Sequence, residues 1–204
     1  IYDSLKKYVK TEKLDGENMY DSGELYGKQE AEKGSIFISL PPVLTIALKR
    51  FVYNMDRFCF TKAHNAVEFP NELDMSEFVA RADNDSNTTS TSTSASTGTT
   101  TTTTEDNDNI YILHSVLVHS GDVGSGHYYA YIHPSSSNDE TQSHIDSSGN
   151  NMNFAKTNGW YRFNDERVCG VTEREAIEYN FGRSKINHTQ SSAYMLLYIR
   201  KSEL

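Results

Sequence analysis

Alternation of apolar and polar residues predicts several β-strands in this chain. From Ile110 to His119, successive side chains alternate between two faces, as in a strand. A tyrosine-rich run at 128–132 and an aromatic run at 160–163 predict two more strands. The stretch 193–200 is apolar on both faces, which is typical of a buried closing strand. These runs indicate a fold built mainly on a β-sheet.

The strongest strand signal lies in residues 35–53. Both faces of this stretch are largely apolar, which predicts a central strand. Pro41 and Pro42 stand at its entrance, where a missing backbone N–H is tolerated. Lys49 and Arg50 at its far end suit either a basic recognition site or a solvated strand end, and the solvated end is the favoured interpretation.

Two short helices are predicted near the ends of the chain. Apolar residues recur at helical spacing between Ile1 and Val9, with lysines on the other side. Near the other end, Thr172 and Glu175 form a capping box, in which the threonine caps the helix and the glutamate reaches back. Gly182 supplies the stop signal.

Two polar tracts interrupt the strand pattern. Residues 80–109 are almost entirely Ser, Thr, Asn and Asp, a composition that cannot bury enough apolar surface to offset its ordering entropy. We expect a disordered insertion there and a mobile loop at 134–159. Strand alternation resumes after the first tract, so residues 1–204 are predicted to belong to one domain.

The strongest candidate chemistry lies at the turn before the tyrosine-rich strand. His127 follows three glycines, whose missing Cβ atoms let backbone approach a substrate closely. Histidine is the default general base near neutral pH, although an ordinary surface turn would look the same. If 128–132 pairs antiparallel with 160–163, Asn164 comes close to His127 and can orient its ring. Asp165 would point to the other side of a regular strand.

The motifs GSGHYYAYI and WYRFND, with LPPVLTIALKRFVY before them and AYMLLYIRK at the end, resemble the C-terminal half of the catalytic domain of ubiquitin-specific proteases. YILHSVLVHSGD and TEREAIEYNFG are most similar to the herpesvirus-associated branch of that family. The resemblance implies an α+β, papain-like ubiquitin-specific protease fold, with partial fingers and palm, and an antiparallel β-sheet with a few helices.

The same resemblance implies roles for six residues. His127 would be the general base, Asn164 its orienting residue, and Asp165 an auxiliary group that orders a water or assists the oxyanion. The implied reaction is hydrolysis of the isopeptide bond after the C-terminal glycine of ubiquitin. His119 and Tyr128 are implied to line the channel for the extended ubiquitin tail. Tyr194 resembles a tyrosine near the family's active site and is a candidate substrate contact, although core packing is the favoured interpretation of this residue.

The nucleophile that this family requires is missing from the sequence. The family carries it in an upstream Cys box, which nothing here matches. Cys59, between two aromatic residues, suits a half-buried strand position, and Cys169 also lacks the required setting. We therefore expect a fragment of an active deubiquitinase that is inactive alone. The alternative is a pseudoenzyme or scaffold that holds ubiquitin without cleaving it.

Charge and composition limit the other partners. The net charge is −9 and no stripe of Lys and Arg stands out, which argues against nucleic acid or an anionic membrane. Four histidines (114, 119, 127 and 133) fall on different strand faces without ligand-spaced carboxylates or thiolates, so neither a metal nor another cofactor is expected. Ubiquitin and ubiquitylated proteins are the expected partners. Two cysteines fit a reducing cytoplasm or nucleus.

Overall fold

The computed structural model describes residues 1–80, 108–134, 159–183 and 190–204. The predicted insertion and the predicted mobile loop therefore lie almost wholly outside the described residues, and the extent of the domain stays a prediction. The described chain forms two compact units, one made of residues 2–40 and 75–109, the other of residue 1, 41–74 and 110–204. No helix in these residues is long and apolar enough to cross a membrane.

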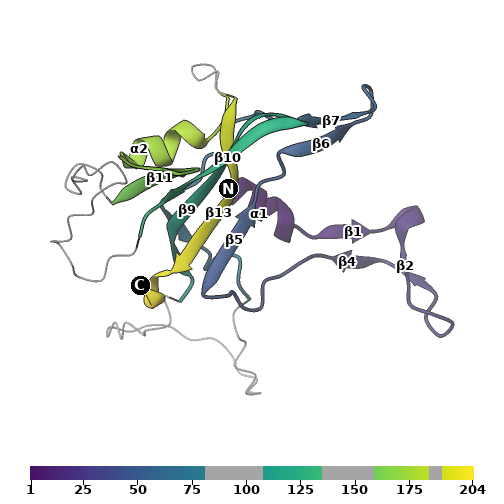
Figure 1. Cartoon of the computed structure of the whole chain (residues 1–204). Helices are drawn as coiled ribbons and strands as arrows, with labels where there is room; N and C mark the ends of the chain where they lie inside the picture. Colours follow the sequence, from purple (N-terminus) through teal and green to yellow (C-terminus); the bar gives the residue numbers. More distant parts are fainter. Residues whose placement is uncertain (81–107, 135–158, 184–189) are drawn as a thin grey trace, which may run out of the picture. The chain divides into compact units, whose positions relative to one another are not determined.

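The larger unit is built on a seven-stranded antiparallel sheet (Figure 1). Its strands follow the order β12, β11, β10, β9, β13 and β5, and the short β8 pairs with β9. The bounds are β5 Val43–Ala47, β8 Glu72–Asp74, β9 Ile110–Asp122, β10 Ser125–Ile132, β11 Trp160–Asn164, β12 Arg167–Val171 and β13 Ser191–Arg200. The predicted pairing of the tyrosine-rich and aromatic strands is confirmed, because Ala130 of β10 lies opposite Phe163 of β11.

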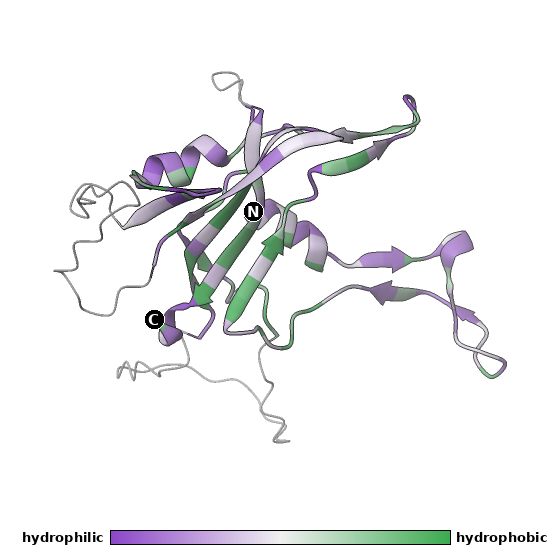
Figure 2. Cartoon of the chain, viewed as in Figure 1, coloured by the Kyte–Doolittle hydropathy of each residue, from purple (hydrophilic) through white to green (hydrophobic). Residues whose placement is uncertain are grey.

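The core of this unit lies on β9 and β13 and the elements beside them. Its largest fully buried side chains include Trp160, Tyr111, Tyr198 and Leu196. A fully buried leucine such as Leu196 contributes about 1.5–3 kcal/mol when it leaves water. Figure 2 shows the resulting hydrophobic band along β9, β13 and β5. Two of the predicted strands, at 110–119 and 193–200, thus carry much of this core as β9 and β13.

Two irregularities shift the pairing between β9 and β13. The register skips Tyr194 on β13 and His114 on β9. Burial on β9 consequently changes phase: it alternates up to Ser115, and the next residue, Val116, is buried as well. A β-bulge re-aims one side chain relative to its neighbours, which matters here for Tyr194.

The prediction of a central strand at 35–53 is wrong in two respects. Only Val43–Ala47 joins the sheet, as β5 at its end, and Val43 is 49% exposed. Phe51–Asn54 forms β6, which pairs with β7 Cys59–Lys62 in a separate hairpin. The apolar residues on both faces suggested burial that an edge position does not provide.

The prediction of a solvated strand end fails for Arg50, which is 2% exposed. Its guanidinium donates hydrogen bonds to the backbone carbonyls of Ala193, Ala63, Asn65 and Phe181. Burial lowers the pKa of this guanidinium below its ordinary value. These acceptors lie on three separate parts of the chain, so no local pattern could have indicated them.

The second predicted helix is confirmed at its start but is short. α2 Glu173–Ala176 begins at a complete capping box between Thr172 and Glu175, and the carboxylate hydrogen bonds lower the pKa of Glu175. A 3₁₀ turn, η4 Glu178–Asn180, follows, and Gly182 then adopts a φ of +113°. A Cβ there would lie 2.9 Å from the carbonyl oxygen of Asn65, so a glycine is required.

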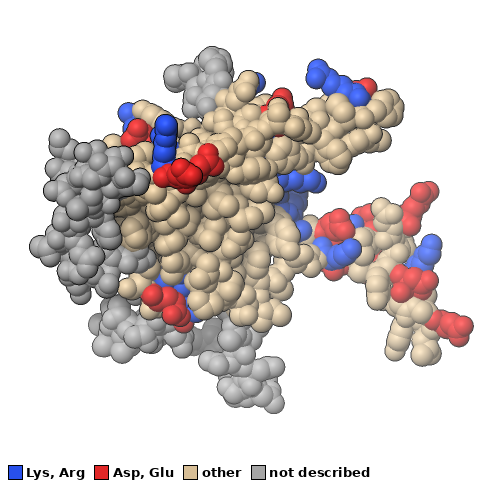
Figure 3. Space-filling model, viewed as in Figure 1, with Lys and Arg blue, Asp and Glu red and all other residues tan. Residues whose placement is uncertain are grey.

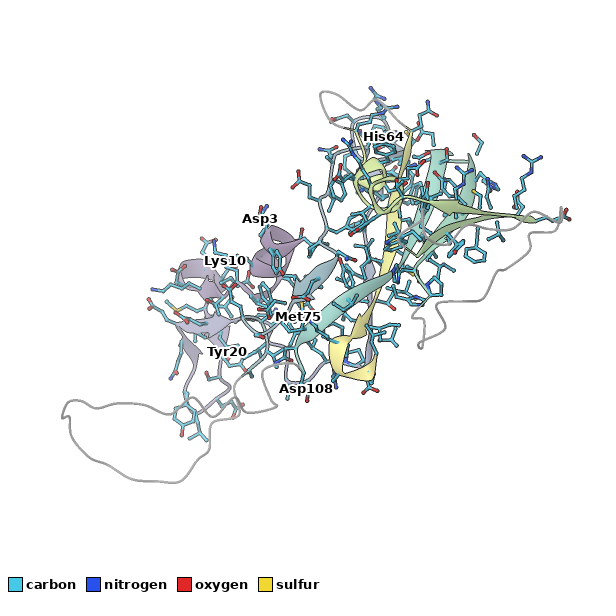
Figure 4. All side chains as sticks on the ribbon, turned by 90° about the vertical axis from the view of Figure 1, so that its left-hand side faces the viewer. Asp3, Lys10, Tyr20, His64, Met75 and Asp108 are labelled. Atoms are coloured by element: carbon cyan, nitrogen blue, oxygen red, sulfur yellow. The ribbon has the colours of Figure 1, made fainter. Side chains whose placement is uncertain are left out.

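The smaller unit contains the predicted N-terminal helix and two short ladders. α1 Tyr2–Val9 is followed by β1 Glu12–Leu14, η1 Gly16–Asn18, β2 Tyr20–Asp21, β3 Lys28–Gln29 and β4 Ala31–Lys33, and η5 Lys201–Glu203 of the larger unit ends the chain. β1 pairs with β4, and β2 pairs with β3. Tyr20, labelled in Figure 4, is 56% exposed.

Candidate active site

The candidate general base lies at the end of the β9–β10 hairpin. His127 pairs with Ser120 across the two strands, three residues after the tight turn at Val123 and Gly124. At two positions of this hairpin the surrounding atoms leave no room for a Cβ, so only glycine fits. A Cβ on Gly121, whose φ is +108°, would lie 2.7 Å from the carbonyl oxygen of Ser125, and a Cβ on Gly126 would overlap the ring of His119.

The structure brings His127 and Asn164 together, as the sequence predicted. Nε2 of His127 lies 2.5 Å from Oδ1 of Asn164, at the end of β11. An amide oxygen can only accept a hydrogen bond, so Nε2 carries the proton. Nδ1 is then the nitrogen with a free lone pair, which is the chemical form that a general base needs.

Asp165 lies on the same side as His127, contrary to the expectation for a regular strand. Its Oδ2 is 3.5 Å from Nε2 of His127. Asp165 has a φ of +52°, because it begins the turn between β11 and β12, and this left-handed conformation re-aims the carboxylate. The side chains of His127 and Asp165 are 47% and 75% exposed, so solvent screens the attraction between them.

The three predicted substrate-contact residues form one aromatic cluster. The ring of Tyr128 lies 4.7 Å from that of His119 and 5.8 Å from that of Tyr194. Phe51 of β6 completes the cluster, 5.2 Å from His119 and 6.1 Å from Tyr194. Tyr194 reaches this cluster from the bulge in β13. Sequence analysis missed Phe51, because nothing in its local pattern distinguishes it from a core residue.

His119 is buried within this cluster and is 3% exposed. Among the described residues, its Nδ1 has no hydrogen-bond partner, and neither does Oγ of Ser192, the residue opposite it on β13. Burial, and after it the charge of Lys62, lower the pKa of His119. His119 is therefore neutral near pH 7 and brings no positive charge to the site.

Neither cysteine lies at the hairpin that carries His127. Cys59 is on β7 opposite Asn54 and is exposed, so the expectation of a half-buried residue is wrong. Cys169 is on β12 opposite Arg162. Within the part of the chain that the structure describes, no group of three or more His, Cys, Asp or Glu side chains could hold a metal ion.

The charged residues of the larger unit leave much of one face neutral. On the face shown in Figure 3, Lys, Arg, Asp and Glu lie mainly at the margins of the sheet and form no continuous basic patch. An unbroken basic surface would be the mark of a nucleic-acid partner. The visible face does not have that character.

Comparison with known proteins identifies the family. The model of the family described as ubiquitin carboxyl-terminal hydrolase matches residues 4–198. The chain therefore belongs to this family of ubiquitin-specific thiol proteases, and corresponds to its C-terminal portion, as the motifs predicted.

Similar relatives occur in fungi, plants and animals. Ubiquitin carboxyl-terminal hydrolase 5 of Schizosaccharomyces pombe is 35% identical over 214 residues, which cover 100% of this chain and 16% of the relative. Ubiquitin C-terminal hydrolase 12 of Arabidopsis thaliana is 36% identical, over 100% of this chain and 16% of the relative. Ubiquitin carboxyl-terminal hydrolase 7 of Drosophila melanogaster is 35% identical, over 100% of this chain and 15% of the relative. The chain thus spans about one sixth of the length of these relatives.

A solved structure confirms the predicted fold class. The SAGA DUB module of Ubp8, Sgf11, Sus1 and Sgf73 bound to monoubiquitin matches with a TM-score of 0.60 and 24% identity. The match covers 98% of this chain and 32% of the matched chain. The chain therefore has a ubiquitin-specific protease fold, mostly antiparallel sheet with few helices.

Proposed function

We propose that this chain is part of a cysteine-type deubiquitinase, to which it supplies the general base and the residue that orients it. The contact between Nε2 of His127 and Oδ1 of Asn164 is the observation that carries the proposal. It joins the end of a hairpin to the end of a neighbouring strand and leaves Nδ1 free to take a proton. Family membership supports the reaction class, hydrolysis at the carboxyl terminus of ubiquitin.

In the proposed reaction, a cysteine outside this chain is the nucleophile. His127 takes the thiol proton, and the thiolate attacks the carbonyl of the isopeptide bond after the last glycine of ubiquitin. His127 then gives the proton to the departing lysine amine, and a water molecule hydrolyses the thioester. Asn164 holds the ring in the productive tautomer. Asp165, 3.5 Å from the same nitrogen, is the auxiliary group that stabilises the imidazolium or orders a water.

The proposed substrates are ubiquitin and ubiquitylated proteins. We assign the aromatic cluster of His119, Tyr128 and Tyr194 to the extended tail of ubiquitin, because it lies directly beside His127 in the sheet. A structurally similar protein was solved with monoubiquitin. The segments YILHSVLVHSGD and TEREAIEYNFG favour the herpesvirus-associated branch of the family. Cytoplasm and nucleus are the proposed location.

The second candidate is a ubiquitin-binding pseudoenzyme. The positions of the two cysteines, on β7 and β12, favour it, because neither lies at the hairpin of His127. Such a protein would retain the aromatic cluster and hold ubiquitin without cleaving the bond.

A ubiquitin probe with a C-terminal electrophile distinguishes the two functions in the full-length protein. We expect labelling of wild type, loss of labelling in His127→Ala, and unchanged labelling in Glu166→Gln, an exposed neighbour of Asp165. Ubiquitin binding without labelling of wild type would establish the pseudoenzyme. If His127→Ala is labelled at the wild-type rate, His127 is not the base.

A further inference from the structure

Lys62, at the end of β7, is a buried lysine whose hydrogen-bond acceptors in the described structure are all backbone oxygens. It is 6% exposed. Its ammonium donates to the carbonyl oxygens of His119 at 2.8 Å, Gly121 at 2.9 Å and Gln190 at 2.8 Å. An ammonium group has three N–H donors, so these three acceptors use all of them.

The three carbonyls lie where the β9–β10 hairpin, which carries His127, extends beyond the first residue of β13. His119 and Gly121 flank Ser120 on β9, and Ser120 is the residue that pairs with His127 on β10. The pairing between β9 and β13 ends at Ser120, opposite Ser191. Gly121 therefore has no β13 residue opposite it, and the Lys62 ammonium supplies the donor that the next residue of a strand would otherwise provide.

The charge of Lys62 is surrounded by other charged and titratable groups. Burial is the largest effect and lowers the pKa of Lys62 to about 8; the charges of Arg50 and Arg183 also oppose its protonation, and Asp122 favours it. His64, labelled in Figure 4, lies next to the segment that follows α2, and burial lowers its pKa as well. His64 is thus already neutral at pH 8, where the two arginines and Asp122 keep their charges.

We propose that Lys62 is a positioning residue for the proposed deubiquitinase reaction, which holds the hairpin of His127 in place through the carbonyls of His119 and Gly121. This inference rests on the proposed function. Lys62 touches neither the reacting atoms nor the ring of His127; it fixes the strand opposite His127. Displacing a catalytic group by about 1 Å can lower a rate about 100-fold, so a tether of this kind has a kinetic effect.

The test compares Lys62→Met with Lys49→Met in the full-length protein, using a fluorogenic ubiquitin C-terminal amide. Lys49 is exposed and adjacent to Arg50, and it serves as the matched control. We expect kcat to fall about 10- to 100-fold in Lys62→Met, with KM changed less than about 3-fold. An unchanged kcat, or a change confined to KM, overturns the proposal. Lys49→Met should behave as wild type.

Lys62→Arg keeps the proposal testable if Lys62→Met does not fold. Arginine remains charged at all accessible pH values, whereas the Lys62 ammonium is neutralised above about pH 8. Wild type should lose turnover above that pH, and Lys62→Arg should hold its rate to a higher pH. Identical pH profiles overturn the proposal.

Hydrogen exchange separates failure of this inference from failure of the proposed function. Peptides that cover residues 119–128 should exchange at least about 10-fold faster in Lys62→Met than in wild type. If Lys62→Met does not fold, the same peptides should exchange at least about 10-fold faster in wild type above pH 8 than in Lys62→Arg at the same pH. This readout needs no enzymatic activity. Unchanged exchange overturns the inference even where wild type is active, and faster exchange in an inactive wild type supports the tether while refuting the reaction.

Discussion

Replacing Arg50 by methionine tests whether a single buried cation joins the separate segments of the larger unit. Three of its hydrogen bonds are short, to Asn65 at 2.6 Å, Ala193 at 2.9 Å and Phe181 at 3.0 Å, and a longer one reaches Ala63 at 3.4 Å. The acceptors span β13, the segment after β7 and the segment after α2. Arg50 thus connects parts of the chain more than 100 residues apart.

The expected loss of stability follows from these contacts. Hydrogen bonds to a charged group contribute about 1.5–3 kcal/mol each, so three short ones give a gross value of about 5–9 kcal/mol. Burying the charge opposes this, and methionine fills part of the space, so the net loss is smaller. We expect Arg50→Met to lower the free energy of unfolding by about 3–5 kcal/mol, which is a large part of the 5–15 kcal/mol of a typical domain.

Hydrogen exchange of the full-length protein measures this loss locally. Peptides from β13 should exchange roughly 140- to 3,700-fold faster in Arg50→Met, since each 1.4 kcal/mol corresponds to a factor of ten. Arg57→Met, at the exposed turn between β6 and β7, is the matched control and should exchange as wild type does. Exchange of β13 within about 3-fold of wild type would refute the reasoning, because the carbonyls would then be satisfied without Arg50.

Three further predictions concern the site and its surroundings. Asn164→Ala should lower kcat/KM about 100-fold or more, because it removes the direct contact with His127. Asp165→Asn should lower kcat/KM at most about 5-fold, since its exposed ion pair with His127 contributes up to about 1 kcal/mol. Gly126→Ala should abolish activity, because its methyl group would overlap the ring of His119, and steady-state assays on a folded variant check this. The free energy of unfolding of wild type, relative to Lys62→Met, should rise between about pH 8 and 10.5, because burial lowers the pKa of Lys62 in the folded chain and the unfolded chain then binds more protons; denaturation across this range measures it. This global gain accompanies the local loosening of the hairpin, because the neutral amine costs less to bury but keeps only two N–H donors for three carbonyls.

A specific outcome contradicts each of these three predictions. A larger effect of Asp165→Asn than of Asn164→Ala would reverse the two roles. Wild-type kinetics in Gly126→Ala would show that the His119 ring can move aside without consequence. A stability difference between wild type and Lys62→Met that does not vary with pH would mean that Lys62 titrates alike in the folded and unfolded chains.

Local patterns in the sequence determined most of the strands, the cap of α2 and the pairing that brings His127 to Asn164. Each depends on residues close together in the chain or on one register between two strands, so periodicity and motif spacing were sufficient. The placement of His127, the proposed base, beside Asn164, its proposed orienting residue, therefore follows from the sequence by itself.

Only the tertiary structure decided the edge position of β5, the orientation of Asp165 and the burial of Arg50 and Lys62. Apolar faces look alike on a central and an edge strand, and the positive φ of Asp165 arises in a turn that a strand pattern does not specify. The two cations reach carbonyls up to 143 and 128 residues away. Their burial is stable because those distant acceptors converge on them, and convergence of that kind leaves no signal in the local sequence.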